Sequence, residues 1–409
     1  MPKLSLAVSL LCALTFALAL AIPKGYALGI LSLFLLSLVF LYKAKTSLSR
    51  FSKEDALLAL SFLAYFLLTG VWDVARGSEM SALDNPSRFL FAVSVLMLMQ
   101  LVIVKRSFLL WGCALGAVGA FGMAAYECFY MGIGRVGGGH NPIMFGNIAM
   151  LLAGLTVFGT VATYFSGARQ WLVITLVAAA LLGIGAAVLS GTRGSWLMLP
   201  VIAAGLLFSI GFKRANKRLV LQVGVVCLAV FAVIGVASKD RFARLASDFQ
   251  AYQEGSLQSS SGHRIELWRS AVIMFEAEPL LGVGEVNYKE AQLQNILQKR
   301  VIPGISDYGH AHNEFLDTAA KRGLIGVVAL LLLYAVPLWL FAKRILNPAL
   351  SPYVRSWALV GATIPLSYIV FGLTQSMFGH SSGVLMYAFP VVFMWAAVKS
   401  LEQEPNPHA

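Results

Sequence analysis

Side chains that could move a proton gather in one short segment, GHAHNEFLDTAAKRG, which runs from Gly309 to Gly323. Asn313 is expected to cap a helix that ends at Gly323. His312 lies at the first turn, where the positive end of the helix dipole lowers the pKa of an imidazole below about 6.5. A neutral imidazole can take a proton from a hydroxyl, so His312 is the predicted general base; the alternative is a histidine that merely caps the helix. His310 could serve equally by this reasoning, although we expect it to face away on the approach to the helix.

Four arginines near the predicted ends of apolar segments could bind an anionic substrate: Arg135, Arg193, Arg264 and Arg269. In SGTRGSW small residues flank Arg193, which leaves room for a ligand, although a lone interfacial arginine often reaches to lipid headgroups instead. Arg264 begins an amphipathic stretch in which nearby glutamates could pair with it on a solvated face. His140 and Asn313 are further candidates for substrate binding.

The composition places these residues in a membrane protein. Hydrophobic residues make up 58% of the 409 residues and charged residues 12%, whereas soluble domains carry about 25% charged residues. Segments long and apolar enough to span a bilayer as helices occur at 4–22, 26–42, 56–72, 89–104, 107–131, 143–165, 171–190, 195–212, 219–237, 324–342, 354–373 and 381–398. The predicted fold is therefore an all-α, polytopic integral membrane protein with about twelve spans.

Lysine and arginine predict the orientation of these spans. With the N-terminus inside, 16 of the 31 Lys and Arg residues lie in inside segments, 10 lie in the long loop 238–323, and 5 lie in short outer segments. Long loops hardly count toward topology, so both termini are predicted to be cytoplasmic. The net charge of +12 then reflects topology and gives no reason to expect a nucleic-acid partner. Met1 to Ala21 could alternatively pass for a signal peptide.

The chain divides into three predicted parts: spans 1–237, an outer loop domain at 238–323 that carries the histidine, and spans with a tail at 324–409. Within the loop we expect four helices, which are SKDRFARLASDFQAYQEG, HRIELWRSAVIMFEAEP, YKEAQLQNILQKR and the segment that follows His312. A turn broken by glycines, LLGVGEVNY, separates the second helix from the third. A loop of this length in a compact protein is usually functional.

Several motifs are absent from the sequence. It holds no DxD pattern and no HExxH pattern, which disfavours a metal-dependent glycosyltransferase or a zinc protease. No metal site and no cofactor are predicted. The four cysteines, Cys12, Cys113, Cys128 and Cys227, all fall in apolar segments and are expected to be small apolar fillers. Few ionisable residues lie within the spans, so a lipid-glycan transporter is a weaker alternative.

Three segments resemble the O-antigen ligase family, within the group of ligases and polymerases that use lipid-linked sugars. They are SGTRGSW at 190–196, HRIELWRSAVIMFEAEPLLGVG at 263–284, and HAHNEFLDTAAKRGLIG at 310–326, where His312 matches the essential histidine of the family. The resemblance implies a GT-C-like glycosyltransferase with a periplasmic loop in the bacterial inner membrane. The segments do not separate a ligase from a polymerase.

The resemblance also implies a reaction, in which a glycan moves from undecaprenyl pyrophosphate to a sugar hydroxyl of lipid A–core. Arg193 and Arg264 would bind the pyrophosphate and His312 would activate the hydroxyl, in an inverting transfer without a metal. The expected partners are this donor, lipid A–core and membrane lipids. An O-antigen polymerase and a protein O-oligosaccharyltransferase remain alternative enzymes.

Overall fold

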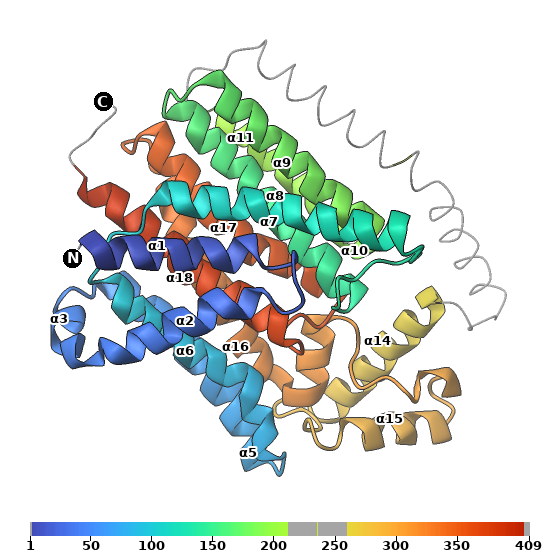
Figure 1. Cartoon of the computed structure of the whole chain (residues 1–409). Coiled ribbons are helices and arrows are strands. Elements are labelled where there is room, and N and C mark those ends of the chain that lie inside the picture. Colours follow the sequence, from blue (N-terminus) through green and yellow to red (C-terminus); the bar gives the residue numbers. More distant parts are fainter. Residues whose placement is uncertain (1, 212–234, 236–259, 405–409) are drawn as a thin grey trace.

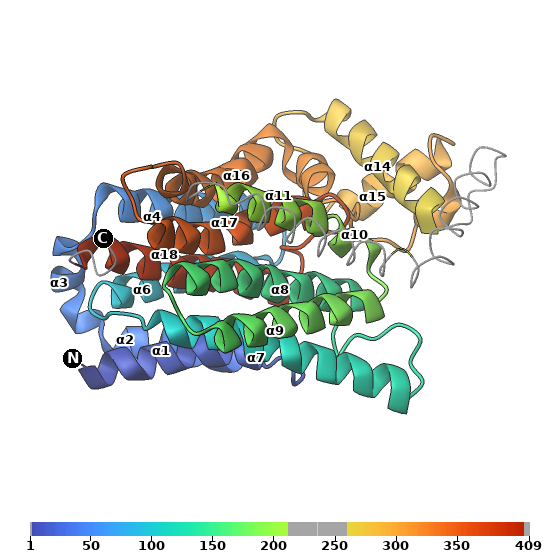
Figure 2. The same cartoon turned by 90° about the horizontal axis from the view of Figure 1, so that it is seen from above.

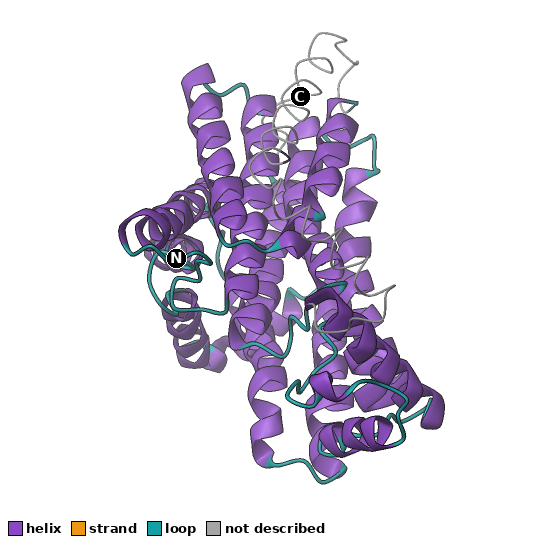
Figure 3. Cartoon of the chain, turned by 90° about the vertical axis from the view of Figure 1, so that its right-hand side faces the viewer, coloured by secondary structure: helices purple, strands orange, loops and turns teal. Residues whose placement is uncertain are grey.

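The computed structural model describes residues 2–211, 235 and 260–404, and this part of the chain contains helices and loops but no strand (Figure 3). The first half of the chain contains α1 (Pro2–Ala17), α2 (Tyr26–Val39), η1 (Leu41–Lys43), α3 (Ala44–Ser49), α4 (Lys53–Tyr65), η2 (Phe66–Val71), α5 (Trp72–Ala75), η3 (Met80–Leu83), α6 (Asp84–Met99), α7 (Arg106–Ala125), η4 (Tyr126–Tyr130), α8 (Pro142–Phe165), α9 (Gln170–Leu189), α10 (Arg193–Trp196) and α11 (Met198–Ile210). The second half contains α14 (Ser260–Ala277), α15 (Tyr288–Leu297), η5 (Pro303–Ile305), α16 (Glu314–Ile345), α17 (Pro352–Gly372) and α18 (Ser381–Gln403). The prediction of an all-α polytopic fold is confirmed.

Eleven of the twelve predicted spans correspond to helices in the described part of the chain. Nine helical segments there are long and apolar enough to cross a membrane, and α1 and α2 are shorter apolar helices. The chain is therefore a multi-pass membrane protein. The predicted span at 219–237 and the first predicted loop helix, 238–255, lie outside the described residues, apart from residue 235.

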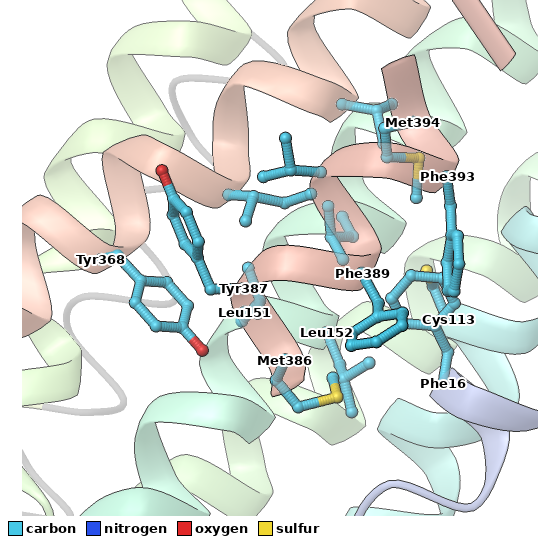
Figure 4. Packing of buried hydrophobic residues seen from close by; sticks show 14 of the residues in the cluster. Phe16, Cys113, Leu151, Leu152, Tyr368, Met386, Tyr387, Phe389, Phe393 and Met394 are labelled. Atoms are coloured by element: carbon cyan, nitrogen blue, oxygen red, sulfur yellow. The ribbon is translucent and has the colours of Figure 1, made fainter. Parts of the chain in front are cut away.

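The core of the bundle lies around α8, α17 and α18, which are the most buried of the nine long helices. Phe16 of α1 meets Phe393 of α18 edge to face at 6.1 Å between ring centroids, and Tyr368 of α17 meets Tyr387 of α18 at 4.8 Å (Figure 4). Small residues let backbones approach, as where Gly183 of α9 faces Ala153 of α8. This close packing holds the loops at the end of the bundle in fixed positions.

The start of α1 and the end of α18 lie at one end of the bundle, whereas α14 and α15 lie at the other (Figures 1 and 2). Near the termini, Arg106 at the start of α7 forms a bidentate ion pair of 2.9 Å with Glu404. At the far end α14 packs against α15 and α16. Residues from the loop domain and from the bundle therefore meet there.

A pair of glycines joins the loop domain to the bundle. α16 is interrupted at Gly323, whose φ of 58° and ψ of −153° are not helical, which is the predicted end of the helix that begins after Asn313. Gly282 of the predicted glycine turn lies against this break, because a Cβ on Gly282 would lie 2.4 Å from the backbone nitrogen of Arg322. Val283 N donates to Ala320 O at 2.9 Å, and Leu324 N donates to Pro279 O at 2.8 Å. The close approach of two backbones explains why this turn holds glycines.

Candidate active site

The start of α16 fixes the position of His312. Asn313 has an extended backbone, and its side-chain oxygen accepts from Phe315 N at 3.0 Å and from Leu316 N at 3.1 Å. The predicted N-cap is thereby confirmed. His312 itself has a φ of +50°, an uncommon left-handed conformation for a residue with a side chain. The cap and this turn direct the half-buried imidazole out of the helix and toward the loop that joins α17 to α18.

That loop supplies a hydrogen-bond partner that determines the tautomer of His312. Gln375 Oε1 lies 2.7 Å from His312 Nδ1, and Gln375 Nε2 lies 2.9 Å from His380 Nε2. An amide oxygen can only accept, so Nδ1 of His312 carries the hydrogen and Nε2 keeps a lone pair in the neutral ring. Gln375 is fully buried, which holds the His312–Gln375–His380 chain in one geometry.

His310 packs on His312 instead of facing away, so the expected orientation of His310 is wrong. The two ring centroids lie 4.2 Å apart, and His310 Nδ1 accepts a hydrogen bond of 3.2 Å from the backbone N–H of His312. The physical reason is the turn at His312, which folds the chain back on itself. Because Nδ1 of His310 is an acceptor, Nε2 carries the proton in the neutral ring and acts as a donor.

All three clustered histidines are harder to protonate than free histidine. Burial lowers the pKa of His310 to about 3, with the neighbouring His312 charge as the next cause. Burial also lowers the pKa of His312, and Arg264 adds to the effect while Gln375 opposes it. The pKa of His380 is lowered by burial and by His312. The predicted direction for His312 is therefore confirmed, with desolvation as the largest cause.

The structure brings Arg135 and Arg193 within electrostatic reach of Arg264. Burial lowers the pKa of Arg264, and the charges of Arg193 and Arg135 lower it further. In the described part of the chain, no carboxylate forms an ion pair with Arg264, because nearby Glu266 lies 4.0 Å from Arg269 and accepts from Ile302 N at 3.2 Å. Arg264 is therefore a buried cation with two positive neighbours, which favours binding of an anion beside it.

The loop that carries Gln375 also holds Arg193 in place. Arg193 begins α10, and a Cβ on the following residue, Gly194, would lie 2.1 Å from Oγ1 of Thr374. Thr192 donates its hydroxyl to Pro142 O at 2.9 Å, which fixes the turn on the start of α8. The small residues around Arg193 therefore permit close packing of this turn.

Three predicted substrate-binding residues, Arg269, His140 and Asn313, have side chains with other contacts. Arg269 lies about 140° around α14 from Arg264 at 3.6 residues per turn, and its side chain is 60% exposed and faces Glu266. His140 lies 5.7 Å from Tyr26 between ring centroids, and burial lowers its pKa. The side chain of Asn313 is occupied by the cap and by a 3.2 Å bond to Leu373 O. The structure therefore does not bring Arg269 or His140 to His312.

Sequence reasoning missed three members of the site, namely Gln375, His380 and Tyr308. Tyr308 lies between two histidines, with its hydroxyl 3.3 Å from His263 Nδ1 and its ring centroid 5.5 Å from His312. The available signal was the polar loop TQSMFGHSS, a short connection between two apolar segments. Among the described residues, no three His, Cys, Asp or Glu side chains form a cluster that could hold a metal ion.

Comparison with known proteins identifies a family that part of this chain resembles. The family model described as O-antigen ligase matches residues 177–331, which include Arg193, Arg264 and His312. This part of the chain, residues 177–331, is similar to the O-antigen ligase family. The predicted resemblance is confirmed, and all three segments that carried it lie inside the match. The match supports a function of the O-antigen ligase or polymerase type.

Two relatives extend the comparison. A protein of Haemophilus influenzae, described as uncharacterized, is 29% identical over 391 residues, which are 94% of this chain and 96% of that protein. An O-antigen ligase of Escherichia coli (strain K12) is 20% identical over 178 residues, which are 42% of this chain and 42% of that protein. The first relative matches most of the chain, and the second connects less than half of the chain to a named activity.

Proposed function

We propose that the protein is an O-antigen ligase, which transfers a glycan from undecaprenyl pyrophosphate to a sugar hydroxyl of lipid A–core. The observation that carries the proposal is that His312, whose Nε2 keeps a lone pair, lies within electrostatic reach of Arg264. The charges of Arg193 and Arg135 in turn lower the pKa of Arg264. A base beside an anion site is the arrangement that this reaction needs.

The three arginines would bind the pyrophosphate of the donor. Bringing guanidinium groups together while burying one of them is unfavourable in the free protein, and a ligand with several negative charges relieves that repulsion. Guanidinium stays charged at all relevant pH values and can bind phosphate oxygens in a bidentate way. The same contacts stabilise the charge that develops as the bond between C1 and the phosphate oxygen breaks.

His312 would activate the acceptor. Its Nε2 takes the proton from the acceptor hydroxyl while that oxygen forms a bond to C1 of the donor sugar, and undecaprenyl pyrophosphate leaves with the electron pair. One displacement inverts the anomeric centre. Because His310 uses Nδ1 to accept a backbone hydrogen bond, His312 is the better candidate for the base. The proposed transfer uses no metal, since the pyrophosphate is already a good leaving group and arginines supply the positive charge.

The proposed location is the bacterial inner membrane, with the histidine and arginines on the periplasmic side and both termini in the cytoplasm. The charge distribution of the loops supports this orientation. The donor, lipid A–core and the surrounding lipids would then all reach the site from the same membrane surface.

The direct test supplies purified protein in nanodiscs with undecaprenyl-pyrophosphate-linked glycan and lipid A–core, with and without EDTA. A ligase joins the glycan to lipid A–core, and the product forms equally in EDTA. A lengthened lipid-linked glycan would show a polymerase, and transfer to a Ser- or Thr-containing protein would show an oligosaccharyltransferase. Loss of product in EDTA with rescue by Mg²⁺ or Mn²⁺ would contradict the metal-free mechanism.

A further inference from the structure

A cavity of about 620 Å³ lies beside the first turns of α16. Its walls come from the end of α4 and η2, from η3 and the start of α6, from the turn at 285–286, from α16, and from the loop before α18. Its volume is in the range of small-molecule sites, about 300–1,000 Å³. Of the residues that line it, none is Arg135, Arg193, Arg264 or His312.

The charge of this cavity is opposite to that of the arginine site. Six carboxylates line it against three cations. Two of the cations are already paired, since Lys321 lies 3.2 Å from Asp317 and 3.1 Å from Glu285, and Arg322 forms a bidentate pair with Asp73. Glu314 is buried and already accepts a 2.9 Å bond from Phe378 N, and the two other carboxylates not used in these pairs, Glu79 and Asp84, outnumber the remaining cation, Arg88. Such a lining repels phosphate groups.

The uncharged lining groups suit a ligand rich in hydroxyls. Ser78, Ser81, Ser381 and Asn85 contribute hydroxyl and amide groups. The Ser78 hydroxyl is buried and has no hydrogen-bond partner among the described residues, although a buried hydroxyl is normally satisfied. Ionised carboxylates only accept hydrogen bonds, so their natural partners are donors such as sugar hydroxyls or amines.

A single layer of chain separates the cavity from the histidine cluster. Gly379 and Ser381 both line it, and they flank His380, which is bonded through Gln375 to His312. From the other side, Asp317 lines the cavity and also accepts a 2.9 Å bond from the backbone N–H of Ala311, between the two reactive-site histidines. A ligand in the cavity would therefore lie near the chain that carries His312, and it would not contact Arg135, Arg193 or Arg264.

We propose that this cavity binds the carbohydrate of the acceptor, as an uncharged or amine-bearing polyhydroxyl chain. This inference rests on the proposed function, because it assigns the second substrate of the same reaction. The protein then sorts its two substrates by charge. The anionic pyrophosphate goes to the arginines, and the hydroxyl-rich acceptor goes to the carboxylate-lined cavity.

The test compares two tryptophan substitutions in η3. Ala82 lines the cavity, so Ala82→Trp fills part of it, whereas Met80 is 69% exposed and does not line it, so Met80→Trp is the matched control. The probe is core oligosaccharide freed of acyl chains and phosphates, and its binding to protein in nanodiscs is measured by calorimetry. Binding of undecaprenyl pyrophosphate is measured on the same samples and reports that each variant is folded.

We expect Ala82→Trp to weaken oligosaccharide binding at least tenfold and to leave undecaprenyl pyrophosphate binding unchanged, with Met80→Trp like the natural protein. Asp84→Asn should weaken oligosaccharide binding in the same direction. Arg264→Ala should do the reverse and weaken pyrophosphate binding alone. These results would support the acceptor site even if the joined product never formed, in which case the proposed function would fail by itself.

Several results would overturn the inference. Among them are a natural protein that does not bind the oligosaccharide, an Ala82→Trp variant that binds it as tightly as Met80→Trp, and an oligosaccharide site that is lost in Arg264→Ala. If joined product forms normally in Ala82→Trp, the acceptor binds elsewhere while the proposed function stands. Displacement of the oligosaccharide by a Ser- and Thr-rich peptide that binds more tightly would also count against a carbohydrate acceptor.

Discussion

Gln375 Oε1 lies 2.7 Å from Nδ1 of His312, and this contact leaves Nε2 as the nitrogen of that ring that can accept a proton. The two residues are 63 positions apart in the sequence, and the amide is fully buried. Gln375 is therefore a positioning residue for His312, and it connects the loop before α18 to the start of α16.

The first prediction concerns pH. Because the pKa of His312 is lowered, its neutral form persists below about pH 6.5, and the rate should fall on the acid side with a midpoint below that value. Gln375→Glu places a negative charge at Nδ1, favours the imidazolium and should move this midpoint to higher pH. The measurement is the pH dependence of turnover for both proteins. An unmoved acid limb in Gln375→Glu would count against the role of His312 as base.

Removing the amide should slow the reaction without loss of donor binding. Gln375→Leu leaves Nδ1–H without its acceptor, and we expect turnover to fall about tenfold or more. The control is Ser376→Ala, because the buried Ser376 hydroxyl has no hydrogen-bond partner among the described residues. Equal loss in both variants would point to a general disturbance of the loop.

Lysine substitutions of Arg193 and Arg264 should show that donor binding needs planar guanidinium groups and not only positive charge. Arg193→Ala and Arg264→Ala should each weaken binding of lipid-linked donor about tenfold or more. Arg193→Lys and Arg264→Lys should restore only part of it, because lysine offers no bidentate contact. Arg269→Ala is the control, since its side chain is exposed and faces Glu266. Donor affinity in nanodiscs decides the matter, and full rescue by lysine would exclude bidentate binding.

The contact between the glycine turn and α16 should be sensitive to one methyl group. In Gly282→Ala, the new Cβ would lie 2.4 Å from Arg322 N at a φ of 66°, so the loop domain should lose about 3 kcal/mol or more of stability. Gly77→Ala is the control, because its φ is 94° but no atom lies within 4 Å, and we expect about 1–2 kcal/mol. Thermal unfolding measures both, and equal effects would mean that the close approach is unimportant.

The orientation of the chain can be tested with two reporters. A reporter fused after Ala409 should be cytoplasmic, and one inserted in the segment 259–262 should be periplasmic, because short loops with excess Lys and Arg stay inside. Accessibility to a membrane-impermeant label gives the result. Two reporters on the same side would overturn the predicted topology.

Much of the fold and part of the site could be predicted from the sequence, because they follow from local patterns. Apolar runs marked eleven of the described helices, and the order of Asn313, acidic residues and Gly323 marked the start and break of α16. The small residues around Arg193 were expected to leave room for a ligand, whereas the structure shows Gly194 packed on Thr374. Each of these signals depends on neighbours within a few residues.

Contacts between distant segments carried no such signal. Gln375 has no periodic pattern around it, and its role becomes visible only when α17 and α18 bring it to His312. The orientation of His310 depended on the left-handed backbone of His312, which a non-glycine residue rarely adopts. The cavity likewise combines residues near 80 with residues near 315 and 380.

The central claim is that His312 acts on the acceptor while the arginines hold the donor, and one set of single-turnover measurements tests it. His312→Ala and Arg264→Ala are compared in nanodiscs for donor binding and for transfer to lipid A–core. We predict that His312→Ala binds donor normally and transfers about 10²- to 10⁴-fold more slowly, whereas Arg264→Ala loses donor binding. A His312→Ala variant that loses donor binding as severely as Arg264→Ala would contradict this account and make the histidine a phosphate ligand.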